Sequence, residues 1–152
     1  MQSFPPTIII RHRLENLKKC SLRGLETRPD FIFLRYPSHD SLPDLTQTII
    51  LTLDAPPLTP EDGCKGLLLI DATWRYAAKM MQSIPSEYQP NHRSLPGHYR
   101  TAYPRRQEDC ADPTRGLASI EALYLCYLIL NRSTQGLLDH YYWRDQFLQI
   151  NQ

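Results

Sequence analysis

The sequence predicts one α/β domain, in which a mostly parallel β-sheet is flanked by helices. Four short segments, residues 7–10, 31–34, 48–53 and 67–70, are rich in β-branched, aliphatic or aromatic side chains over most of their length. Strands that are apolar on both faces are typical of parallel sheets covered by helices on both sides. Segments with helical spacing lie between and after these strands. The 152 residues are enough for one domain with a hydrophobic core.

Four helices are expected from the spacing of apolar residues and from capping residues. Residues 14–25 place leucine or cysteine on one helical face, and Gly24 stands near the end of that segment. Ser119 is a favoured N-cap with Glu121 in the first turn, and the helix that follows is apolar nearly all round, as expected of a central helix. The expected helices are 14–25, 74–83, 119–130 and a last one that is capped by Ser133 or Thr134 and carries Leu137 to Ile150.

Residues 84–116 are expected to form a functional loop. Their five prolines exclude a long helix, and a long aperiodic stretch inside a compact domain is commonly functional. Because the whole chain has a formal net charge of only +1, a nucleic-acid partner requires a local basic surface, which this segment supplies. Arginines interleaved with aromatic residues favour contacts with RNA, although a solvated basic loop has the same composition. The expected RNA-binding residues are Arg93, Arg100, Tyr103, Arg105, Arg106 and Arg115.

Several other classes of protein are disfavoured. No apolar stretch reaches the roughly 18–20 residues that span a membrane, and no signal peptide is recognisable, so a cytoplasmic location is expected. Cys20, Cys64, Cys110 and Cys126 form no metal-binding pattern and are expected to be reduced thiols. The chain also has no histidine pattern of a metal hydrolase, so no metal is expected. A phosphate-binding glycine loop and a serine-nucleophile motif are absent from the sequence as well.

The predicted functional site lies where the fourth strand ends. Ligands of open α/β sheets bind beyond the carboxyl ends of the strands. Asp71 follows strand 67–70, and Thr73 and Trp74 stand where the chain turns into the next helix. The structural alternative is that Asp71 or Thr73 caps the helix and Trp74 packs in the core. The amides at the start of helix 119–130 are suited to binding a carboxylate, or belong to an ordinary capped helix.

Asp71-Ala72-Thr73-Trp74, after an aliphatic strand and followed by Ala77, resembles the Asp-x-Ser/Thr-Trp motif of two related enzyme families. These are the DTW-domain tRNA-uridine aminocarboxypropyltransferases and the ribosome-biogenesis enzymes that place the same group on an rRNA pseudouridine. Further segments that resemble these enzymes follow in the same order along the chain. They are Lys18-Lys19-Cys20-Ser21, Tyr99-Arg100, Arg115, Leu117-Ala118-Ser119-Ile120-Glu121-Ala122, and Trp143 with Phe147-Leu148-x-x-Asn151.

The resemblance implies a SPOUT-like fold with a C-terminal trefoil knot, S-adenosylmethionine as cofactor and RNA as substrate. The start and the end of the chain resemble the rRNA enzymes, so rRNA is slightly favoured over tRNA. The chain departs from both families, because only Cys20 stands where most DTW proteins carry an N-terminal cysteine cluster and Ala102-Tyr103-Pro104-Arg105 replaces the Asn-Pro segment of the rRNA enzymes, so both RNA classes stay open. A monomer is slightly favoured as well. The cofactor-binding residues that the resemblance implies are Ser21, Asp71, Thr73, Trp74, Ala77, Leu95 (facing the adenine) and Ser119.

The resemblance also implies how the reacting carbon is selected. Trp74 and Ala77 would enclose the methyl group of the sulfonium, while Ser21 and Ser119 would lie near the aminocarboxypropyl end. Burial of the methyl group blocks methyl transfer, and an indole face suits a cation. The attacking uridine nitrogen must lose a proton, and Asp71 is the candidate base. Two alternatives stay open: an RNA methyltransferase of the same fold, and a non-catalytic ribosome-assembly protein that binds RNA.

Overall fold

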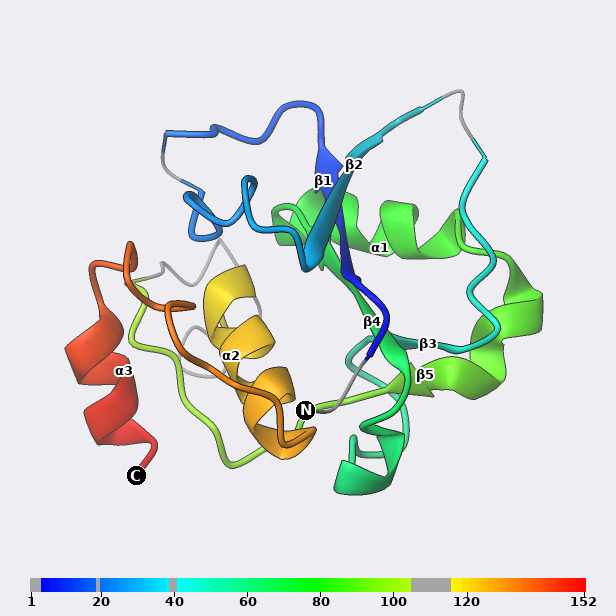
Figure 1. Cartoon of the computed structure of the whole chain (residues 1–152). Coiled ribbons are helices and arrows are strands. Elements are labelled where there is room, and N and C mark those ends of the chain that lie inside the picture. Colours follow the sequence, from blue (N-terminus) through cyan, green and yellow to red (C-terminus); the bar gives the residue numbers. More distant parts are fainter. Residues whose placement is uncertain (1–3, 19, 39–40, 105–115) are drawn as a thin grey trace.

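The structure is a computed structural model that describes residues 4–18, 20–38, 41–104 and 116–152. Its centre is a five-stranded parallel sheet with the strand order β2-β1-β4-β3-β5 (Figure 1). The predicted α/β class and the four predicted strands are confirmed, and a fifth strand was not predicted. The strands are β1 (Thr7–His12), β2 (Phe31–Tyr36), β3 (Thr48–Leu51), β4 (Gly66–Asp71) and β5 (His92–Arg93).

Each face of the sheet has its own hydrophobic core, because successive side chains of a strand point to opposite faces. Leu67 and Leu69 of β4 pack in one core with α2 (Ser119–Ile129). Leu68, between them, packs in the second core, which α1 (Trp74–Gln82) covers. The two helices accordingly lie on opposite sides of the sheet (Figure 1). The expected helices 74–83 and 119–130 are both present with nearly the predicted bounds.

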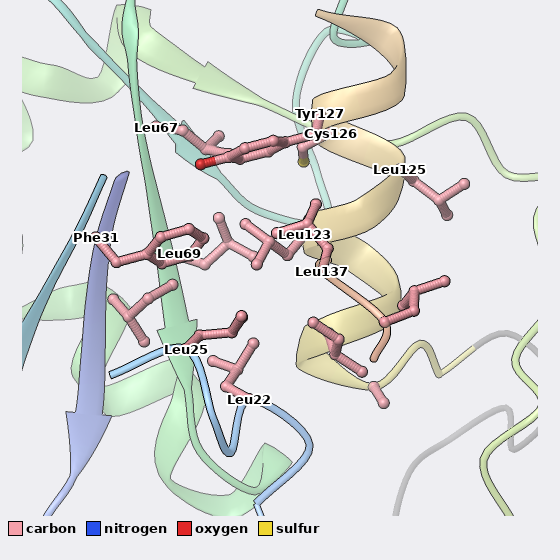
Figure 2. Close-up of a cluster of buried hydrophobic side chains, with 14 of the residues drawn as sticks. Leu22, Leu25, Phe31, Leu67, Leu69, Leu123, Leu125, Cys126, Tyr127 and Leu137 are labelled. Atoms are coloured by element: carbon pink, nitrogen blue, oxygen red, sulfur yellow. The ribbon is translucent and has the colours of Figure 1, made fainter. Parts of the chain in front are cut away.

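A third layer explains why α2 is apolar nearly all round. The short helix α3 (Arg144–Ile150) lies on the side of α2 that faces away from the sheet, and Phe147 meets Tyr124 edge to face with 5.9 Å between ring centroids. Figure 2 shows Leu123 directed towards β4 and Leu125 directed away from it, although both are buried. Each fully buried leucine contributes about 1.5–3 kcal/mol to folding.

The helix predicted for residues 14–25 is wrong, since this segment forms successive turns. Cys20 and Leu25 are buried as the predicted helical face requires, but Leu14 and Leu17 of the same face are 59% and 57% exposed. Leu22, which the predicted face did not include, is fully buried. Polar side chains and thiols of the segment bond to nearby backbone amides, as in the bond from the amide of residue 18 to Asn16 and from the amide of residue 22 to the Cys20 thiol. Such local bonds offer the backbone an alternative to helix.

The last predicted helix is wrong over most of its length. Residues 134–142 form turns, and only α3 is helical in this region. Gly136 has a φ of +81°, in the left-handed region that interrupts a right-handed helix. The N-cap of α2 is Ala118 and not Ser119, so Ser119 is the first helical residue and its hydroxyl is available for another contact.

Residues 84–116 contain more regular structure than expected. A 3-10 helix, η2 (Ser86–Asn91), leads directly into β5, whose two residues pair with the end of β3. A strand this short has no periodicity of its own, so only its tertiary pairing defines it. In the part of the chain that the structure describes, no helix has both the length and the apolar character needed to cross a membrane.

Candidate active site

The candidate site lies at the carboxyl ends of the two central strands. Arg11 of β1 and Asp71 of β4 are direct partners in the strand register. The chain that leaves β1 runs over the face that α2 covers, where it buries Leu22, whereas the chain that leaves β4 enters α1 on the opposite face (Figure 1). Neighbouring strands whose connections diverge in this way mark the position where α/β sheets bind ligands. The predicted position of the site is therefore the switch point of this sheet.

Asp71 is at the centre of this junction and is almost fully buried. Its Oδ2 atom accepts hydrogen bonds from Arg11 Nε at 3.0 Å and from the Cys20 thiol at 3.1 Å. Its Oδ1 atom accepts one from the Ser119 hydroxyl at 3.0 Å. Three segments far apart in the sequence, the end of β1, the first loop and the start of α2, therefore meet at one carboxylate. Neither Asp71 nor Thr73 caps α1 with its side chain.

Arg11 provides the positive charge of the site. In addition to the salt bridge with Asp71, its guanidinium contacts Glu26 Oε1 at 3.2 Å and lies 4.6 Å above the ring of Phe33. Burial alone would lower the pKa of Arg11, but the neighbouring Cys20 and Asp71 raise it above its ordinary value. Arg11 is therefore a fixed cation that two carboxylates share.

Two further titratable groups border Asp71. Burial and the negative charge of Asp71 raise the pKa of the Cys20 thiol to about 12, so this thiol stays protonated and donates its hydrogen to the carboxylate. Burial, and next the charge of Asp71, also raise the pKa of Glu15, although Arg11 acts in the opposite direction. The three described cysteines, Cys20, Cys64 and Cys126, are free thiols, as predicted.

The start of α2 is attached to the site by side chains on both sides. Ser21 Oγ accepts a hydrogen bond from the amide of Ile120 at 3.2 Å, while the Ser119 hydroxyl reaches Asp71. Glu121, which is fully buried, accepts four further hydrogen bonds. Its donors are the Ala118 amide (2.7 Å), the Thr101 hydroxyl (2.6 Å), the Ala102 amide (2.9 Å) and the Tyr141 hydroxyl (3.0 Å).

The structure brings together Ser21, Asp71 and Ser119 among the predicted cofactor-binding residues. Thr73 is exposed and is the N-cap of α1. Trp74 is the first residue of that helix, and its side chain lies outside the described part of the structure. Ala77 is half-buried on α1, and the partly buried Leu95 packs against the core on the α2 side of the sheet.

The predicted RNA-binding residues lie beyond β5 or at its end. The guanidinium of Arg93 bonds to the carbonyls of Pro90 and His92 and lies 3.5 Å from Asp62. The guanidinium of Arg100 bonds to the carbonyls of Gly97 and Tyr99. Tyr103 is half-buried against the core. The other three predicted residues, Arg105, Arg106 and Arg115, lie outside the described residues.

The sequence analysis missed Arg11, Glu15 and Glu26, and assigned Cys20 no contact in the site. Arg11 was detectable in principle, because it follows the aliphatic run of β1 as Asp71 follows that of β4, and ligands bind at the carboxyl ends of such strands. Asn151 was noted only as part of a terminal motif. In the structure its side chain bonds both the amide and the carbonyl of Arg100, each at 2.8 Å, and so attaches α3 to the segment before Thr101.

The site is suited to a cationic ligand. Glu15, Glu26 and Asp71 are three carboxylates around one guanidinium, that of Arg11, which leaves a formal surplus of two negative charges among these four groups. Ligand atoms of Glu15, Cys20 and Asp71 lie within 4.8 Å of one another. A metal ion would require the Cys20 thiol to ionise, and its high pKa and the adjacent Arg11 oppose that. An organic cation fits this environment better.

Comparison with known proteins finds a similar fold among the solved structures. No family model matches the chain, and no curated protein matches it. The structure of the SAM-dependent rRNA:acp-transferase Tsr3 from Vulcanisaeta distributa matches it with a TM-score of 0.71 and 23% sequence identity, covering 97% of this chain and 79% of that chain. At this identity the likeness shows the fold, an α/β fold with a five-stranded parallel sheet flanked by helices.

Proposed function

We propose that this protein transfers the 3-amino-3-carboxypropyl group of S-adenosylmethionine to a uridine or pseudouridine of structured RNA, with rRNA favoured over tRNA. The observation that carries the proposal is the junction of Arg11, Asp71 and Ser119 at the switch point of the sheet. The motifs of the sequence support it, and so does the likeness in fold to a SAM-dependent rRNA:acp-transferase over nearly the whole chain.

The charges of the described residues fit this cofactor. S-adenosylmethionine carries a sulfonium, an ammonium and one carboxylate, so it is a net cation, and the surplus of carboxylates around Arg11 attracts it. The start of α2 suits its carboxylate, because the amides and dipole at a helix N-terminus favour an anion. The proposed cofactor-binding residues are Ser21, Asp71, Thr73, Trp74, Ala77, Leu95 and Ser119.

The cofactor supplies an electrophilic carbon next to its sulfonium, and the protein selects which of the three such carbons is exposed. Trp74 and Ala77 of α1 are proposed to cover the methyl group, so the carbon of the aminocarboxypropyl chain faces the RNA. Asp71 is the proposed base for the uridine proton. A carboxylate has about four lone-pair sites, and three donors already bond to Asp71, so one site is left for the substrate proton.

The RNA is proposed to lie along the segment that follows β5. Arg93, Arg100 and Tyr103 belong to the described part of this segment, and Arg105, Arg106 and Arg115 are proposed to extend the basic surface. Lowering the number of phosphate contacts reduces the dependence of binding on salt. Charge-removing variants of these arginines should therefore bind RNA more weakly and with a shallower salt dependence.

Nucleoside mass spectrometry tests the proposed reaction. The purified protein is incubated with S-adenosylmethionine and with unmodified rRNA or tRNA, and the digested nucleosides are compared with a reaction that lacks protein. We expect a uridine or pseudouridine that carries the aminocarboxypropyl group, with methylthioadenosine as the second product. A methylated nucleoside in its place would establish a methyltransferase. Intact RNA binding without any cofactor binding in calorimetry would establish a non-catalytic RNA-binding protein.

The Asp71→Asn variant tests the proposed base in the same assay. We expect it to bind S-adenosylmethionine but to lose turnover by about 10²–10⁴-fold, the usual contribution of a general base. Full turnover with normal cofactor binding would exclude Asp71 as the base. The Glu87→Gln variant, which makes the same carboxylate-to-amide change at an exposed position on η2, is the matched control and should keep full turnover.

The proposal extends to architecture and assembly. We propose a SPOUT-like arrangement with a C-terminal trefoil knot, and a monomer in solution. The motif order and the likeness in fold to the acp-transferase structure support the first point. An experimental structure with a continuous trace from β5 through residues 105–115 to α2 tests the knot, and analytical ultracentrifugation tests the monomer.

A further inference from the structure

Glu15 is a carboxylate at the edge of the candidate site that the proposed mechanism does not use. It stands in the turn directly after β1, where its amide bonds to the carbonyl of His12 at 3.0 Å. The residue is half-buried, and among the described residues its carboxylate has no hydrogen-bond or salt-bridge partner. The other carboxylates of the site, Asp71 and Glu26, both bond to Arg11.

The surroundings of Glu15 favour the arrival of a cation. One of its oxygens lies within 4.8 Å of the ligand atoms of both Cys20 and Asp71. Burial and the charge of Asp71 raise the pKa of Glu15, and Arg11, which lowers it, is already shared by two other carboxylates. An unpaired carboxylate in partly desolvated surroundings is unfavourable until a positive charge joins it.

We propose that Glu15 binds the α-ammonium group of the aminocarboxypropyl chain of S-adenosylmethionine. This inference rests on the proposed function. The end of that chain is a zwitterionic amino acid, so its recognition requires both an acceptor for the ammonium and donors for the carboxylate. The start of α2 provides the donors, and Ser119 connects it to Asp71. Glu15 lies beside the same Asp71, and its carboxylate supplies an acceptor that no other described group of the site occupies.

The role of Glu15 is specific to one part of the cofactor, and this makes it testable by binding alone. Methylthioadenosine retains the adenosine and the sulfur but has no aminocarboxypropyl chain. Decarboxylated S-adenosylmethionine retains the ammonium but has no carboxylate. S-adenosylhomocysteine retains the ammonium but has no sulfonium charge, so a Glu15 contact with the ammonium should weaken its binding to Glu15→Gln as well. Calorimetry of the full chain with these three ligands and S-adenosylmethionine therefore separates the ammonium contact from contacts with the carboxylate and the sulfonium.

We expect the Glu15→Gln variant to bind S-adenosylmethionine and its decarboxylated form about 10–100-fold more weakly, the usual effect of losing a charged hydrogen bond. Its affinity for methylthioadenosine should equal that of the wild type. The Glu87→Gln variant, at an exposed position on η2, is the matched control and should bind each of these ligands normally. Thermal unfolding of both variants checks that they are folded.

A second measurement uses only the wild-type chain. Because Glu15 must be ionised to pair with an ammonium, affinity for S-adenosylmethionine should fall as the pH is lowered through the raised pKa of Glu15, while affinity for methylthioadenosine falls less. The neighbouring groups that share this environment are Arg11, Cys20 and Asp71. Of these, Arg11 and the Cys20 thiol keep their protonation over the acidic range, so they do not produce the difference.

The outcomes separate this inference from the proposed function. Unchanged affinity of Glu15→Gln for S-adenosylmethionine, or an equal loss for methylthioadenosine, would overturn the role of Glu15 and leave the proposed function standing. Absence of S-adenosylmethionine binding to the wild type would overturn both. Binding of Mg²⁺ alone that depends on Glu15 would replace the ammonium with a metal ion and would also overturn the inference.

Discussion

Glu121→Gln is the most informative single substitution outside the junction, because the structure shows that an amide cannot replace this carboxylate. Each oxygen of Glu121 accepts one backbone amide, that of Ala118 or of Ala102, and one hydroxyl, that of Thr101 or of Tyr141. A hydroxyl can rotate to accept a hydrogen bond, but a backbone amide cannot. Whichever way the glutamine is oriented, its NH₂ group faces one of the two amides.

The expected loss of stability follows from the one backbone amide that must lose its hydrogen-bond acceptor. A buried unsatisfied donor costs about 1–3 kcal/mol, and the remaining bonds lose the strength that ionic charge gives them, so a total of about 2–3 kcal/mol is expected. For a chain of this length, about 1 kcal/mol lowers the melting temperature by roughly 2–4 °C. Calorimetric unfolding should therefore show Glu121→Gln melting roughly 5–10 °C below the wild type.

The matched control is again Glu87→Gln, which changes the same side chain at an exposed position and should alter stability by less than about 0.5 kcal/mol. The refuting result is a Glu121→Gln variant that melts within about 1 °C of the wild type. In that case the carboxylate would not hold Ala102 and Ala118 together, and the attachment of the start of α2 to the segment after β5 would need another explanation.

Two further predictions concern the first loop and its thiol. Gly24→Ala should destabilise the protein by at least about 2 kcal/mol, because φ is +96° and an added Cβ would lie 2.2 Å from the His140 ring. The control variant Gly97→Ala, whose added Cβ would have no atom within 4 Å, should melt like the wild type. Equal melting temperatures of the two variants would contradict this prediction. Iodoacetamide at pH 8 should alkylate the exposed Cys64 quickly and leave Cys20 unmodified in the folded protein, because Cys20 is buried and its thiol pKa is about 12. Mass mapping that finds both cysteines modified at similar rates would refute the claim that the Cys20 thiol stays protonated.

Four of the five strands and the central helix were predictable because their residues have strong local preferences. The aliphatic and β-branched runs of β1, β3 and β4 and the apolar run of α2 favour one structure over a short window. Residues 14–25 show where that reasoning fails. Their leucines have helical spacing, but local hydrogen bonds and the left-handed Gly24 favour turns, and Leu14 and Leu17 are exposed.

The candidate site was likewise predictable only in part. By itself, the sequence determined that Asp71 follows a buried parallel strand, because a run of aliphatic residues with a carboxylate after it has few other interpretations in an α/β chain. Its partners Arg11, Cys20 and Ser119 stand 60, 51 and 48 residues away, and no local pattern encodes such distances. Only the tertiary structure, by pairing β1 with β4 and placing α2 on one face, decided which groups surround that carboxylate and that one of them, Glu15, has no partner among the described residues.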